Sequence, residues 1–172
     1  YFSRGLSMRI HGFASVVAAS VVAVILLATS SCASGGKQMD IAKMREFALS
    51  YTQAWSSQNP ESVASHFAEN GSLQINENPP SVGRIELTET AKSFMTQIPD
   101  LALTMDDLSI NGDGFIYRWT LRGTNSGPNG NGNSVEISGF EEWTMSREGL
   151  ILESKGHMDL DDYQRQLSAV AP

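Results

Sequence analysis

The chain has 172 residues, with 12 Lys and Arg against 19 Asp and Glu, a formal net charge of −7 and a single cysteine. This length predicts one domain of ordinary size. The acidic balance, with no Lys/Arg-rich stripe, argues against nucleic acid as a partner, because cations that neutralise phosphates are the main source of that affinity. A single cysteine excludes an intramolecular disulfide.

Residues 1–31 have the layout of a bacterial signal peptide. Residues 1–38 carry no Asp or Glu, and Arg9 precedes an apolar run at 13–28 that ends in small residues. A permanent transmembrane helix needs about 20 apolar residues, so a retained span is the weaker alternative. We expect the residues before Met8 to be extra and to lie outside the fold.

Cys32 follows three small residues, Thr29 to Ser31, an arrangement that resembles a bacterial lipobox. We expect acylation of Cys32 and cleavage before it, which would anchor the protein to a membrane of the cell envelope. The alternative is an ordinary signal peptide with an incidental cysteine. Cleavage would leave 10 basic and 19 acidic residues, a net charge of −9. We expect residues 32–38 to form a tether and residues 39–172 to form the domain.

Two helices are predicted at the start of the domain. Asp40 is a good N-cap, and apolar residues from Ile41 to Trp55 recur every three or four positions. Asn59-Pro60 predicts the start of a second, shorter helix with an apolar stripe that includes Phe67.

A strand and a third helix are predicted next. Residues 69–71 have the composition of a turn, and Leu73 and Ile75 alternate with polar residues as in a short strand. We expect residues 76–83 to form a loop. The helix that follows ends before Pro99.

After Pro99 the apolar period changes from about 3.6 to 2, which predicts antiparallel strands connected as hairpins. Four strands are expected, followed by a short helix at 160–167, and residues 124–133 are expected to form a flexible Gly- and Asn-rich loop. Phe115, Tyr117 and Trp119 share one face of the second of these strands. Arg118 and Arg122 lie on the other face, where they are expected to pair with Glu136 or Glu142.

These elements predict an α+β fold, in which a curved antiparallel sheet wraps around about three N-terminal helices. Such a sheet, capped by helices, leaves a conical cavity. The aromatic row at 115, 117 and 119 is expected to line it, together with Trp55 from the first helix.

From about Asp40 to Leu167 the sequence resembles the SnoaL-like polyketide cyclase branch of the nuclear transport factor 2-like superfamily. The resemblance implies the cone-shaped roll of that superfamily, whose members include cyclases, isomerases and non-catalytic binders. It is carried by the order and spacing of Trp55, Phe67 to Gly71, Gly83-Arg84, Pro99 to Leu101, Trp119 to Thr124, Asp159 and Gln166-Leu167.

The resemblance also implies a candidate base. In the cyclases of this family an Asp near the end of the last strand removes a C–H proton next to a carbonyl, and the matching residue here is Asp159. An aromatic cavity would raise the pKa of this group by desolvation. His157, on the same side of the strand, would then assist by hydrogen bonding to the developing enolate. The alternative for Asp159 is a cap of the terminal helix.

Several other polar residues are candidates for the same site. Lys155 and Glu153 continue the row of Asp159 and His157, and they are expected to form a polar pocket wall. Glu77 falls near the position of the base in steroid isomerases of this fold. Asn125 departs from the family, which often has His or Thr there, and this departure weakens the case for catalysis.

Two functions follow from this reading. The first is a surface-anchored pocket protein that binds a small apolar molecule without chemistry and forms a homodimer through the outer sheet face. The second is a cyclase- or isomerase-like enzyme with Asp159 as general base. The sequence predicts no cofactor and no metal site, because the histidines at 66 and 157 are isolated and no phosphate-binding loop is present.

Overall fold

The computed structural model describes residues 40–168, which lie within a unit that spans Lys37–Pro172. The predicted signal peptide, Cys32 and the tether fall outside the described residues. Between residues 40 and 168, no helix is long and apolar enough to cross a membrane.

The helices follow the predicted starts closely. Two N-caps are confirmed: the Asp40 carboxylate accepts a hydrogen bond from the amide of Ala42 at 3.0 Å, and the Asn59 side chain accepts one from the amide of Ser62 at 3.1 Å. Phe67 belongs to a strand, so the second helix is shorter than predicted. The helices are α1 (Ile41–Ser56), α2 (Pro60–Ala64), α3 (Gly83–Gln97) and α4 (Leu160–Ser168).

Six strands form one sheet in the order β2-β1-β6-β5-β4-β3. The last four strands along the chain pair as consecutive antiparallel neighbours, as predicted, while β1 pairs parallel to β6. Their bounds are β1 (Phe67–Ile75), β2 (Ser81–Val82), β3 (Ala102–Asn111), β4 (Gly114–Thr124), β5 (Ser134–Met145) and β6 (Ile151–Met158).

The turn predicted at 69–71 is instead an irregularity inside β1. The register with β6 shifts between Phe67, which pairs with Ile151, and Ser72, which pairs with Glu153. Gly71 lies in this segment, and a Cβ there would come within 2.8 Å of the Ile151 carbonyl oxygen. The close approach of the two backbones therefore requires glycine.

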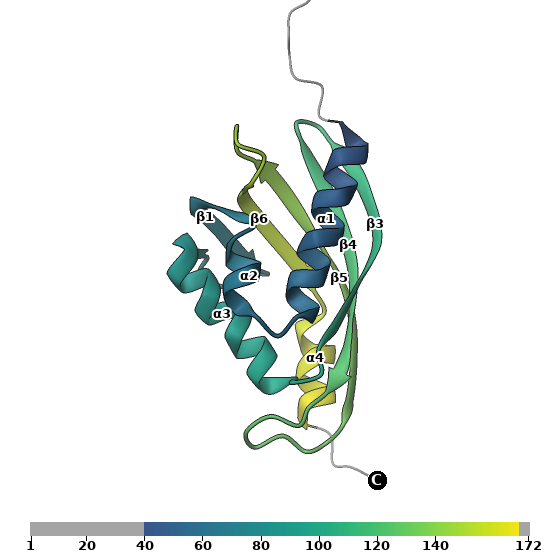
Figure 1. Ribbon diagram of the computed structural model, residues 1–172. Coiled ribbons are helices and arrows are strands. Elements are labelled where there is room, and N and C mark those ends of the chain that lie inside the picture. The colour runs from purple at the N-terminus through teal and green to yellow at the C-terminus, as the bar shows by residue number, and fades with distance from the viewer. Residues whose placement is uncertain (1–39, 169–172) are drawn as a thin grey trace, which may run out of the picture. The chain divides into compact units, whose positions relative to one another are not determined.

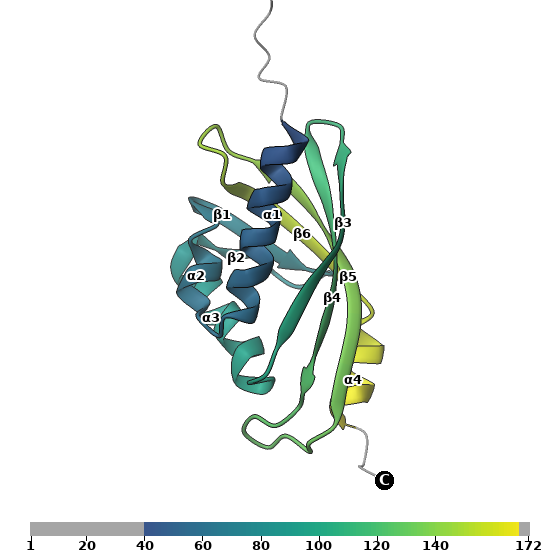
Figure 2. The ribbon, with the colours of Figure 1, turned by 45° about the vertical axis from the view of Figure 1, so that its right-hand side comes forward.

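Helices α1, α2 and α3 cover one face of the sheet, and the sheet curves around α1 (Figure 1, Figure 2). The core between these layers includes a buried aromatic cluster, in which Tyr117 stacks on Trp143 with ring centroids 4.6 Å apart. Tyr51 of α1 meets both rings edge-on, at 5.7 and 5.3 Å. The predicted α+β architecture is confirmed, and the sheet is not closed into a barrel.

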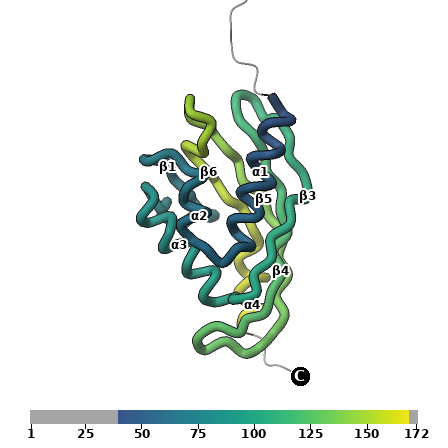
Figure 3. Tube along the Cα trace, in the orientation of Figure 1, coloured from purple at the N-terminus to yellow at the C-terminus, as the bar shows by residue number. Residues whose placement is uncertain are grey.

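The loop between β4 and β5 passes beside α4 at one end of the sheet (Figure 3). Side-chain amides of Asn125 and Asn131 both donate to the Leu167 carbonyl oxygen at 2.9 Å. The amide of Gly127 donates to the carbonyl oxygen of Gln97 at 3.1 Å. The Gly- and Asn-rich segment thus ties the end of α4 to the end of α3.

Candidate functional site

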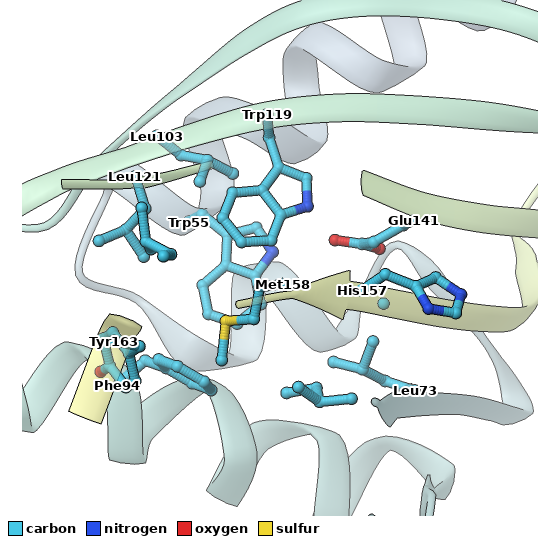
Figure 4. A pocket seen from close by; sticks show the side chains of 13 residues that line it. Trp55, Leu73, Phe94, Leu103, Trp119, Leu121, Glu141, His157, Met158 and Tyr163 are labelled. Atoms are coloured by element: carbon cyan, nitrogen blue, oxygen red, sulfur yellow. The ribbon is translucent and has the colours of Figure 1, made fainter. Parts of the chain in front are cut away.

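A pocket lies between the sheet and the helices, at the C-terminal end of α1 (Figure 4). Its volume, taken as the space open to the centre of a water molecule, is about 50 Å³. This is room for a few waters or for one end of a small molecule. Its lining is mostly apolar, with Glu141 and His157 as exceptions, and consists of Trp55, Leu73, Ile75, Phe94, Leu103, Trp119, Leu121, Ile137, Glu141, Gly156, His157, Met158 and Tyr163.

Glu141 of β5 is the buried carboxyl group of this pocket, with 6% of its surface exposed. Three donors converge on its Oε2 atom: the Ser154 hydroxyl at 2.6 Å, the Trp143 indole N–H at 2.8 Å and the Tyr51 hydroxyl at 3.2 Å. Within the described residues, Oε1 receives only a longer contact of 3.4 Å from the same Tyr51 hydroxyl. One oxygen is therefore fixed, and the other retains capacity to interact with a ligand.

Burial raises the pKa of Glu141 above its ordinary value of 4.5, because the charged form loses its hydration. Hydrogen bonds from Ser154, Trp143 and Tyr51 oppose this shift by stabilising the carboxylate. The hydroxyl of Tyr51 is itself held neutral, since burial and the nearby Glu141 raise its pKa well above 10. The result is one carboxyl group with increased proton affinity in an apolar pocket.

Two of the predicted ligand-binding residues line this pocket, Trp55 in the last turn of α1 and Trp119 in β4. Trp119 pairs with Gly139 of β5, and a Cβ on Gly139 would lie 2.6 Å from the Trp119 ring. The absence of a side chain at position 139 is what leaves room for the indole.

Phe115 and Tyr117 do not line the pocket, which corrects the prediction that the whole aromatic row does so. Both are buried in the core, with at most 1% of their surface exposed. The Tyr117 hydroxyl bonds Thr52 of α1 at 2.7 Å. Helix α1 covers this half of the sheet, so the pocket begins only at Trp119.

The predicted polar wall on β6 is corrected for Lys155 and Glu153, which do not line the pocket, whereas His157 belongs to the lining but has its ring on the outer side of the sheet. Lys155 forms an exposed ion pair with Glu153 at 3.5 Å. The His157 imidazole stacks on Phe140 and bonds Glu142 at 3.2 Å, and it is turned away from the middle of the pocket (Figure 4). Ser154, which lies between Glu153 and Lys155 in the strand, points inward and donates a hydrogen bond to Glu141.

Asp159 is exposed and does not line the pocket. Its carboxylate accepts a hydrogen bond from the amide of Asp162 at 2.8 Å, which is the geometry of an N-cap for α4. The position of Asp159 therefore matches the alternative stated above, in which this residue caps the terminal helix. Glu77 is likewise exposed and outside the pocket lining.

On the outer face, one predicted ion pair is present and the other is replaced by a ring contact. Arg122 pairs with Glu136 at 2.9 Å, as predicted. Arg118 instead lies over the Phe140 ring, 5.4 Å from its centroid. Phe140 is thus covered by Arg118 as well as by the His157 ring.

Sequence reasoning missed Glu141, although a signal for it exists. Strict alternation along β5 places Ile137, Gly139, Glu141 and Trp143 on one face of the strand. An acidic residue in that apolar row is a candidate for a buried functional group. For residues 40–168, no group of three or more His, Cys, Asp or Glu side chains is arranged to hold a metal ion.

The helix-covered curved sheet and its pocket define a nuclear transport factor 2-like domain. Residues 45–167 match the SnoaL-like polyketide cyclase family, so the chain belongs to that family. A comparison with curated protein sequences gives no match.

Solved structures share this fold at low identity. A protein from Jannaschia sp. CCS1 described as a SnoaL-like polyketide cyclase has a TM-score of 0.67 and 16% identity, covering 76% of this chain and 94% of that chain. TsrD from Streptomyces laurentii has a TM-score of 0.65 and 20% identity, covering 77% of this chain and 99% of that chain. The epoxide hydrolase/cyclase-like enzyme SalBIII has a TM-score of 0.62 and 20% identity, covering 72% of this chain and 95% of that chain. SalBIII has a role in pyran ring formation in salinomycin.

Proposed function

We propose that this domain binds a small, largely apolar carbonyl compound and exchanges a proton with it through Glu141. The observation that carries the proposal is a buried carboxyl group that has one oxygen held by three donors and the other available in an apolar pocket. A base held in this way needs little reorganisation when it reacts. Its raised pKa also brings it closer to the pH at which it must accept a proton.

The proposed step is the removal of a proton from the carbon next to the carbonyl. Glu141 Oε1 takes the proton, the electron pair of the C–H bond forms the carbon–carbon double bond of an enolate, and the carbonyl oxygen takes up the negative charge. Return of a proton from Glu141 to the same or another carbon regenerates the carbonyl. The family match of this chain and its structural likeness to the epoxide hydrolase/cyclase-like enzyme SalBIII support a cyclase- or isomerase-like reaction class.

Deuterium exchange tests this step without knowledge of the natural substrate. Cyclohexanone is incubated with the protein in D₂O, and loss of its α-proton signals is followed by NMR. General acid–base groups contribute about 10²- to 10⁴-fold, so the Glu141→Gln variant is expected to lose at least about 100-fold of the protein-dependent exchange rate. Asp159→Asn is the matched control and is expected to retain the wild-type rate.

Binding without chemistry is the second candidate. It is favoured by the pocket wall, because Glu141 is the one carboxyl group among the described residues that line it. In that case the carboxyl group serves as a hydrogen-bonding anchor. Cyclohexanone would then bind with no exchange above that of Glu141→Gln, an outcome that contradicts the proton-transfer proposal and supports the binding role.

We also propose that the protein is exported and anchored to a bacterial membrane through Cys32. Support comes from the unbroken absence of acidic residues at 1–38 and from the small residues before the cysteine. Mass spectrometry of the membrane fraction tests the proposal. Acyl chains on an N-terminal Cys32 are expected, and a free thiol there would contradict anchoring.

A further inference from the structure

We infer that the indole N–H of Trp119 is the group that binds the oxygen atom of the ligand, so that Trp119 determines specificity for a hydrogen-bond acceptor. The inference rests on the proposed function, because it names a second contact of the same ligand. It adds a requirement that Glu141 alone does not impose: the ligand must present an acceptor oxygen close to the carbon that faces the carboxyl group.

The first observation is a buried donor without an acceptor. Trp119 is 8% exposed, it lines the pocket, and its Nε1 atom has no hydrogen-bond partner within residues 40–168. Buried donors are nearly always paired, and an unpaired one destabilises the folded state. A ligand that supplies an acceptor would remove this cost when it binds.

The neighbouring tryptophans identify Trp119 as the free donor. Trp143 already donates its indole N–H to Glu141 at 2.8 Å. The Nε1 atom of Trp55 also has no hydrogen-bond partner within residues 40–168, but it is close enough to the Tyr51 hydroxyl to oppose in part the rise in the Tyr51 pKa that burial and Glu141 cause. Trp55 therefore has a polar neighbour of its own, and Trp119 is the stronger candidate.

The second observation is the placement of Trp119 relative to Glu141. Trp119 pairs with Gly139 on the adjacent strand, and Glu141 lies two residues further along that strand on the same face. Diagonal neighbours of this kind are about 7–8 Å apart at Cα, which is within the span of one small ring. The nitrogen edge of Trp119 is turned towards the end of the pocket that carries the Glu141 carboxylate (Figure 4).

Together these groups select the ligand class. The ligand oxygen that accepts the hydrogen bond from Trp119 would lie next to the carbon whose proton faces Glu141 Oε1. A ketone and its enolate have this arrangement of oxygen and carbon. A protonated amine offers only donors and would leave the Trp119 N–H unpaired. The arrangement therefore favours a carbonyl compound over an amine or a plain hydrocarbon.

Two matched probes test the inference: cyclohexanone, and methylenecyclohexane, in which a CH₂ group replaces the oxygen. Their affinities are measured by NMR titration of the wild type, Trp119→Phe and Trp55→Phe. A neutral hydrogen bond has a net value of about 0.5–1.5 kcal/mol, so Trp119→Phe is expected to lower the ketone-to-alkene affinity ratio roughly 2- to 10-fold. Trp55→Phe is the control and is expected to keep the ratio.

A spectroscopic readout separates hydrogen bonding from a change of packing. In ¹⁵N-labelled wild type, cyclohexanone is expected to shift the indole proton of Trp119 downfield, whereas methylenecyclohexane is not, and the Trp143 indole proton should move little with either. An affinity ratio unchanged by Trp119→Phe, or changed by Trp55→Phe instead, would overturn the inference but leave ligand binding intact. Failure of both probes to bind the wild type would overturn the proposed binding function as well.

Discussion

Glu141 and Glu142 are adjacent in β5, yet they lie in opposite environments. Glu141 points into the domain, is 6% exposed and is surrounded by Ser154, Trp143 and Tyr51. Glu142 points to the outer face, where its side chain is 44% exposed and pairs with His157. The same residue type therefore has two different roles, because successive side chains of a strand point to opposite faces.

The comparison teaches which physical property makes the candidate site. An exposed carboxylate–imidazole contact such as Glu142–His157 is screened by water and adds little to stability or reactivity. Burial removes that screening, raises the pKa of Glu141 and makes its hydrogen bonds strong and specific. The candidate site therefore depends on the position of Glu141 on the inner face of β5, and not on the presence of two adjacent glutamates in the sequence.

Removal of each carboxylate gives the largest expected contrast. Glu141→Ala leaves Ser154 and Trp143 without their acceptor and opens a cavity, so a loss of about 2–4 kcal/mol of unfolding free energy is expected. Glu142→Ala is expected to change it by no more than about 0.5 kcal/mol. Denaturant unfolding of both variants measures the difference, and equal losses would show that the two faces do not differ in this way.

A smaller contrast is expected between two glycines of the inner face. A Cβ at Gly139 would lie 2.5 Å from the His157 carbonyl oxygen and 2.6 Å from the Trp119 ring. Gly139→Ala is therefore expected to cost about 1–3 kcal/mol by overpacking and to displace the Trp119 indole. At Gly156 the nearest atom is 3.3 Å away, so Gly156→Ala should cost less. Thermal unfolding and the Trp119 indole resonance test both; a more costly Gly156→Ala would contradict this ranking.

The fold could be predicted because its signals are local and repeated. Caps at Asp40 and Asn59 and the change of apolar period after Pro99 are read directly from the sequence. The pairing of β1 with β6 could not be predicted in this way. It joins residues far apart in the chain, and β1 also contains an irregularity where a turn was expected.

The site could not be predicted from β6 because its alternation is interrupted. The register with β5 shifts between Glu153, which pairs with Thr144, and Ile151, which pairs with Met145. Ile151 and Ser154 are consequently both buried although they differ in parity. The row of Lys155 and His157 is instead counted back in twos from Asp159, and that count carries no information about which face of β6 is buried. On β5 the alternation is regular, and Glu141 could have been recognised there.

Asp159 provides a test of its two assigned roles. If it caps α4, Asp159→Ala should cost about 1 kcal/mol, while Asp159→Asn should cost little, because Asn is an equally good N-cap. Neither variant should alter ketone binding, since Asp159 does not line the pocket. Unfolding curves and cyclohexanone titrations measure both properties. Loss of exchange activity in Asp159→Asn at unchanged stability would restore the family base to this position.

The inner and outer carboxylates should also differ in how stability depends on pH. Because burial raises the pKa of Glu141 in the folded state, the folded protein holds this proton more tightly than the unfolded chain, whose value is near 4.5. The stabilisation is fully present below about pH 4.5 and is lost as the pH rises through the folded pKa. Hydrogen-bonded surface groups such as Asp100, whose pKa is lowered by Thr124, act in the opposite direction.

A difference measurement isolates the contribution of Glu141 from these other groups. Glu141→Gln removes the titration, so the unfolding free energy of the wild type relative to this variant is expected to fall as the pH rises above about 4.5. Glu142→Gln removes a carboxylate from the outer face of the same strand and serves as the matched control. The quantity compared is the slope of the unfolding free energy against pH, and both variants are expected to remain folded. A difference curve that rises with pH would mean that the three hydrogen bonds outweigh burial, and Glu141 would then be a permanently charged anchor rather than a proton-transfer group.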